Sequence, residues 1–71
     1  MNEYSKELFR SKMSYVEESY ATDIESRIAR VRESADVRTL EGALDDETLQ
    51  KSVLTAIRGQ LRRLRRLQGH A

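Results

Sequence analysis

The strongest chemical signal in the chain is a group of cations near its C-terminal end. Residues 51–71 carry one lysine, five arginines and no acid, although the net charge of the whole chain is only +1. An arginine side chain can donate two parallel hydrogen bonds to a phosphate or a carboxylate, so such a group indicates a polyanionic ligand. The candidate binding residues are Lys51, Arg58, Arg62, Arg63, Arg65 and Arg66.

The spacing of these cations predicts a helix over residues 45–68. At about 100° per residue, the apolar residues of this range fall within an arc of about 160°, and the cations occupy most of the remainder. Asp45 is suited to the N-cap position, and Gly69 is placed to end the helix. The apolar side of this helix can therefore enter a core while the basic side stays available to a ligand.

Two functions are compatible with such a helix. The first is contact with the phosphate backbone of nucleic acid without sequence reading, because the acidic turn at residues 45–47 would repel DNA if the N-terminal end entered a groove. The second is an adaptor, inhibitor or subunit that docks its arginines on an acidic protein surface. A merely solubilising face explains the same residues. Binding to a membrane surface ranks lower, since the apolar side is needed for folding.

Catalytic and metal-binding residues are poorly represented. The single histidine, His70, is one residue from the end of the printed chain, where it would lack the neighbours that orient a ligand or a base. Adjacent acids such as Glu17 and Glu18 point about 100° apart on a helix and do not converge. The sequence therefore predicts a protein that is not an enzyme and has no cofactor, no metal site and no small-molecule substrate.

Residues 3–34 are predicted to form a first long helix. Its apolar residues recur every three or four positions, and they are Phe9, Met13, Val16, Tyr20, Ile24, Ile28 and Val31. Tyr4, Leu8 and Tyr15 form a second patch on roughly the opposite side. Since one hairpin cannot bury both sides, we expect contacts with another copy or a partner at Tyr4, Leu8, Phe9, Met13 and Tyr15.

Residues 35–44 are compatible with a connector or with a short middle helix. A break at residues 34–36, with Asp36 capping a short helix, is favoured over a break at 42–45 because weak helix formers crowd this span. Gly42 suits the C-cap position in either case. Residues 69–71 are expected to be a frayed tail.

The composition favours one all-α domain over residues 1–71. The chain has no proline and no cysteine, and 35% of its residues are charged. The predicted fold is an antiparallel hairpin of two long helices that pack as a coiled coil or at a steeper angle. Because such a hairpin buries little surface, we expect a homo-oligomer. No apolar run is long enough to span a membrane, and a cytoplasmic location is expected.

Overall fold

A computed structural model describes residues 1–10 and 23–69 of the chain. These two ranges contain four helices and no strand, which confirms the all-α prediction. The helices are α1 (Glu3–Phe9), α2 (Ile24–Glu33), α3 (Val37–Leu44) and α4 (Lys51–Gly69).

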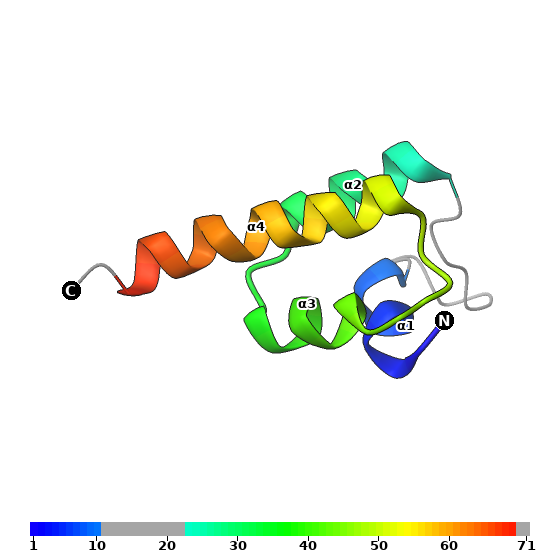
Figure 1. Ribbon diagram of the computed structural model, residues 1–71, viewed down its shortest axis with the longest axis horizontal. Helices are drawn as coiled ribbons and strands as arrows, with labels where there is room; N and C mark the ends of the chain where they lie inside the picture. The colour runs from blue at the N-terminus through cyan, green and yellow to red at the C-terminus, as the bar shows by residue number, and fades with distance from the viewer. Residues whose placement is uncertain (11–22, 70–71) are drawn as a thin grey trace.

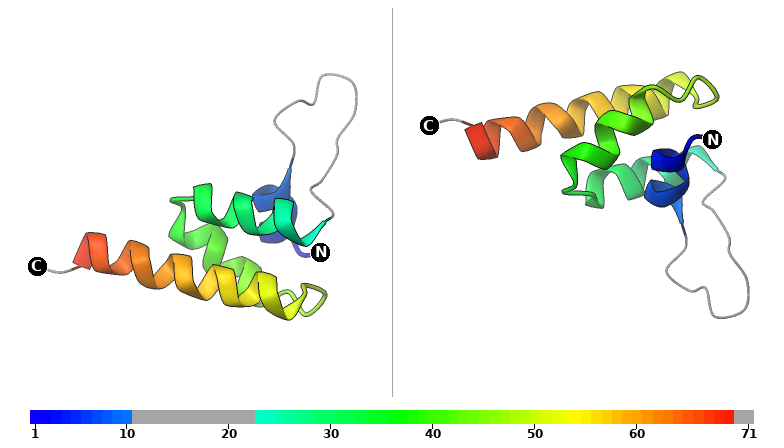
Figure 2. Two further views of the ribbon diagram at one scale, coloured as in Figure 1. Left: turned by 90° about the horizontal axis from the view of Figure 1, so that it is seen from above. Right: turned by 90° about the horizontal axis from the view of Figure 1, so that it is seen from below.

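The four helices form two layers of two helices each (Figure 1). One layer contains α1 and α3, the other contains α2 and α4, and the two layers meet mainly where α3 contacts α4. The helices α2 and α4 lie side by side and run in the same direction, and α3, which connects them in the sequence, runs the opposite way in the other layer (Figure 1 and Figure 2). The long helices therefore do not form the predicted antiparallel hairpin, because α3 reverses the chain. The predicted homo-oligomer stays a prediction, since the structure describes a single chain.

The core lies between the layers and takes side chains from every helix. The fully buried apolar residues, each with none of its surface exposed, are Phe9, Val31, Leu40, Ala43, Val53 and Ile57. The α4 residues among them belong to the apolar arc that the sequence predicted. Leu67 belongs to that arc as well, yet 65% of its surface is exposed. The reason is that the C-terminal end of α4 projects beyond the other helices (Figure 1).

The predicted helix over residues 3–34 is not continuous. The first helix ends at Phe9, and the backbone of Arg10 is extended, with φ −64° and ψ 137°. The carbonyl oxygen of Arg10 accepts a hydrogen bond of 2.6 Å from Nη2 of Arg30, which ties the end of α1 to α2. A new helix begins after Asp23, whose carboxylate accepts a hydrogen bond of 2.9 Å from the Ser26 amide. Local capping therefore overrides the apolar periodicity.

The predicted break at residues 34–36 is confirmed. Asp36 caps α3, because its carboxylate accepts hydrogen bonds from the amides of Arg38 and Thr39 and from the Thr39 hydroxyl. These bonds hold the pKa of Asp36 below its usual value, the Thr39 hydroxyl contributing most. The predicted C-cap at Gly42 is wrong, because this glycine lies inside α3 and has no positive φ angle. Its lack of a side chain instead lets the ring of Tyr4 lie against the helix.

The last helix begins at Lys51 and not at Asp45, so its length is about 28 Å. Asp45 is the C-cap of α3, and its amide donates a hydrogen bond to the Gly42 carbonyl. The carboxylate of Asp46 accepts hydrogen bonds from Asn2 and from Thr48, as described below. The two acids therefore close a turn between α3 and α4, and six residues that fit the helical pattern lie outside the helix.

Candidate nucleic-acid or protein interface on helix four

The six candidate cations all lie on α4, and each of them is exposed. We call this set the basic face; its members are Lys51, Arg58, Arg62, Arg63, Arg65 and Arg66. The opposite side of the helix is held in the core by Val53, Ile57 and Leu61. Burial of that side fixes the rotation of α4 about its axis, so the cations lie on the side of the helix that is exposed to solvent. The helix itself contains no acid.

Five of these six cations have no polar partner within the part of the chain that the structure describes. The exception is Arg65, whose Nη2 lies 2.6 Å from Oε2 of Glu41 on α3. Both side chains of that pair are at least half exposed, so the pair contributes little to stability. The unpaired cations have their hydrogen-bonding capacity available for a ligand.

A groove runs between α3 and α4 beside the basic face. Its volume is about 540 Å³. Leu61, which is buried, and Leu44, which is half-buried, supply its apolar floor. The remaining residues that line it are Glu41, Arg58, Arg62 and Arg65. The groove, called the α3–α4 groove below, therefore joins an apolar surface to three of the six candidate cations.

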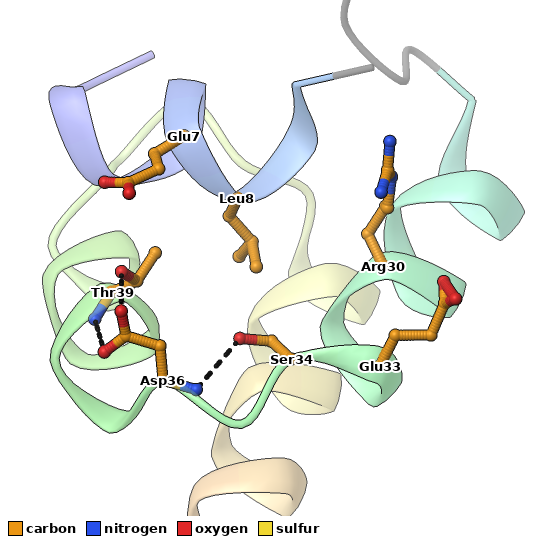
Figure 3. Close-up of a pocket in the computed structure, with 7 residues that line it drawn as sticks. All are labelled: Glu7, Leu8, Arg30, Glu33, Ser34, Asp36 and Thr39. Carbon is orange, nitrogen blue, oxygen red and sulfur yellow. Dashed lines mark hydrogen bonds between the residues drawn. The ribbon is translucent and has the colours of Figure 1, made fainter. Parts of the chain in front are cut away.

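A second cavity lies between α1, α2 and α3 and has a volume of about 210 Å³ (Figure 3). Three carboxylates and one guanidinium surround the Leu8 side chain in it, from Glu7, Glu33, Asp36 and Arg30. Asp36 and Arg30 are already bonded within the chain. Asp36 is bonded to Thr39, its amide donates to the Ser34 hydroxyl at 3.3 Å, and Arg30 is bonded to the Arg10 carbonyl. The two charged groups that remain, Glu7 and Glu33, are both acids, and two acids alone do not define a ligand site.

Asp46, which the sequence places in the acidic turn at residues 45–47, has a structural role that its local pattern does not predict. Asp46 is buried, with 5% of its surface exposed, and its carboxylate accepts three hydrogen bonds. The donors are the Asn2 amide at 2.9 Å, the Thr48 amide at 2.9 Å and the Thr48 hydroxyl at 2.6 Å. Burial acts to raise the pKa of Asp46, but the hydrogen bonds outweigh it and hold the pKa well below the usual range.

Asn2 completes this anchor from the other end of the chain. Its side-chain oxygen accepts a hydrogen bond of 2.8 Å from the Ser5 amide and so caps α1. Its side-chain nitrogen donates a hydrogen bond of 2.9 Å to the Gly42 carbonyl. We call Asn2 and Asp46 together the N-terminal anchor, because they fasten α1 to the α3–α4 turn. No sequence pattern could reveal bonds between residues so far apart in the chain.

A second residue that sequence reasoning missed is Gln60, which is buried on the inner side of α4. Its side-chain amide donates a hydrogen bond of 2.7 Å to the carbonyl of Ser34 at the end of α2. Only 8% of its surface is exposed. A signal was present, since Gln60 falls within the apolar arc of the helical wheel, where a polar residue needs a partner.

The contacts predicted near the N-terminus are only partly available to another molecule. Leu8 and Phe9 are buried within the folded chain. The prediction that these two residues contact a partner is therefore wrong for the fold described above. Phe9 lies instead under the guanidinium of Arg27, at 5.3 Å from the ring centre. Tyr4 remains 38% exposed beside Gly42. Met13 and Tyr15 lie outside the described residues.

The described ranges contain no group of three or more histidine, cysteine or acidic side chains that could hold a metal ion. Among the same residues, no helix has the length and apolar character that crossing a bilayer requires. His70 is not among the described residues.

The basic face and the α3–α4 groove thus place exposed cations beside an apolar surface. No protein-family model matches the sequence, and neither a curated protein nor a solved structure is significantly similar to it.

Proposed function

We propose that this chain is a non-enzymatic binding module whose basic face contacts the phosphate backbone of nucleic acid. The observation that carries this proposal is the set of five exposed cations on α4 that have no polar partner in the described part of the chain. Phosphate contact would supply these cations with charge-assisted hydrogen bonds. Contact with the backbone requires cations spaced along the strand and no reading of base edges, and the basic face supplies such cations.

The dimensions of α4 fit several phosphates. Lys51 and Arg66 are separated by about 22 Å along the helix axis, a length over which one strand of a duplex carries about six phosphates. The exposed acids Asp45 and Glu47 precede the N-terminal end of α4. They would repel phosphates near that end, so α4 is expected to lie along the backbone and not to enter a groove end-on.

The test is a titration of duplex DNA and of RNA at a series of salt concentrations. Four to five phosphate contacts should give a log–log slope of about −4. The variant Arg66→Gln should reduce the magnitude of the slope by about 1 and weaken binding to all sequences alike. A failure of the parent chain to bind either nucleic acid at about 50 mM salt would contradict the proposal, because electrostatic binding is strongest at low salt.

The matched control is Arg32→Gln. Arg32 is exposed on α2 and its loss changes the net charge by the same amount. It lies off α4, so this variant should retain the slope of the parent chain. Equal effects of both substitutions would show that net charge alone, and not the basic face, determines binding.

A further inference from the structure

The α3–α4 groove has a chemistry that phosphate contact does not use. Leu44, which is half-buried, supplies most of the accessible apolar floor, and Leu61 lies beneath it with 3% of its surface exposed. Contact with an apolar surface does not strengthen the binding of a phosphate backbone. The residues that line the groove also include no aromatic ring on which a base could stack. An apolar floor beside arginines fits a ligand that has apolar and acidic groups together.

The shape of the groove selects among such ligands. It follows α4 from Arg58 to Arg65, a distance of about 10 Å, which is the length of about two turns of helix. Grooves between two helices commonly bind an amphipathic helix, whose apolar residues at positions i, i+3 or i+4 and i+7 enter the groove. The volume of about 540 Å³ gives room for apolar side chains of such a helix.

The charges at the rim specify the polar side of the ligand. Arg58 and Arg62 have no polar partner in the described part of the chain, while Arg65 is held by Glu41. The net charge of the six lining residues is therefore positive, and two arginines remain for carboxylates of a ligand.

From these observations we infer that the α3–α4 groove is a docking site for an acidic amphipathic helix of a partner protein. The apolar side of that helix covers Leu44 and Leu61, and its carboxylates bind Arg58 and Arg62. This interaction is distinct from the proposed nucleic-acid contact, but Arg58 and Arg62 belong to both sites, so the two ligands should compete.

The test uses a synthetic helical peptide of about 16 residues, long enough to hold a helix, with leucines at i, i+3 and i+7 and glutamates beside them. A fluorescent label on the peptide reports binding to the full chain by polarisation. A peptide of the same composition in scrambled order keeps the charge and loses the apolar stripe. We expect the ordered peptide to bind at least about tenfold more tightly than the scrambled one, because only it can cover the apolar floor.

Two arginines of α4 provide the matched variants. Arg58 lines the groove, while Arg63 is equally exposed on α4 and does not line it. Neither has a polar partner in the described ranges, so both variants should fold, which circular dichroism can verify. Arg58→Gln should weaken peptide binding by about fivefold or more, and Arg63→Gln should leave it within about twofold.

The outcomes separate this inference from the proposed function. Duplex DNA should lose affinity equally with Arg58→Gln and Arg63→Gln, since each removes one cation. Peptide binding that depends on Arg58 would support the inference even if the chain fails to bind DNA. Equal binding of the ordered and scrambled peptides, equal effects of the two substitutions, or no peptide binding at about 1 mM, the weak end of specific affinities, would overturn it.

Discussion

The helices α3 and α4 differ in how much of their surface the rest of the chain covers. The short helix α3 has α1 on one side and α4 on another, and the N-terminal anchor closes its C-terminal end. The longer helix α4 is covered along one side, and its C-terminal end projects beyond its neighbours (Figure 1). The carboxylates of Asp36, Glu41 and Asp46 at α3 and its ends are bonded within the chain, whereas five of the six cations of the basic face have no polar partner among the described residues. The difference shows that α3 is held on several sides by the chain, whereas the outer side of α4 is left uncovered by the described residues.

The largest expected effect compares a leucine from each helix. Leu40 on α3 is fully buried, whereas 65% of Leu67 on α4 is exposed. Leu40→Ala should lower the free energy of unfolding by about 2–5 kcal/mol, because it leaves a cavity. Leu67→Ala should change it by less than about 0.5 kcal/mol. Urea denaturation measures both values, and a large effect of Leu67→Ala would show that the projecting end of α4 is covered in solution.

The next effect concerns the N-terminal anchor. Asp46→Ala should lower the free energy of unfolding by about 2–3 kcal/mol, because it removes the buried charged acceptor of three hydrogen bonds from Asn2 and Thr48. Asp46→Asn keeps the shape and one acceptor oxygen, so it should cost less. If both variants were as stable as the parent chain, the anchor would have no role in holding α1 on α3.

The same carboxylate predicts a dependence of stability on pH. The pKa of Asp46 is lower in the folded chain than the value of about 3.9 expected after unfolding, so the unfolded state binds the proton more readily. The contribution of Asp46 is therefore complete above about pH 5 and decreases as the pH falls through and below about 4. Urea denaturation at several pH values should show this decrease for the parent chain and a shallower one for Asp46→Asn. Identical pH profiles would contradict it.

Replacing a glycine by alanine should change the free energy of unfolding in opposite directions on α3 and α4. A Cβ atom on Gly42 would overlap ring carbons of Tyr4, whereas a Cβ atom on Gly59 would have open space around it. Gly42→Ala should therefore destabilise the chain by about 1–3 kcal/mol. Gly59→Ala should stabilise it by up to about 1 kcal/mol, because alanine favours a helix.

The control for the glycine pair is a Tyr4→Ala background, measured by the same denaturation. Removal of the ring should abolish most of the penalty at Gly42 and leave the gain at Gly59 unchanged. A penalty at Gly42 that persists without the ring would mean that α1 does not lie against α3 as described.

Sequence periodicity predicted the features that depend on a single helix. It identified which side of α4 enters the core, which side carries the cations and where Asp36 begins a helix. It placed the start of α4 wrongly, because Asp45 and Asp46 have the same local capping chemistry whether they begin one helix or close the turn after another. What distinguishes the turn from a helix start is the hydrogen bond from the Asn2 amide to Asp46, and Asn2 lies near the opposite end of the chain. The helices α2 and α4 run in the same direction because α3 lies between them in the sequence and reverses the chain. A prediction based on two long helices joined by one turn could not give this direction.

The N-terminal anchor has a consequence for the order in which the chain folds. Its hydrogen bonds join residues 40 and 44 positions apart, whereas α3 and α4 are neighbours in the sequence. Closing a long loop costs more conformational entropy than forming contacts between adjacent helices. We therefore expect α3 and α4 to associate before α1 docks, and α1 to detach first during partial unfolding. In hydrogen exchange, the amides of α1 should then exchange sooner than those in the middle of α4.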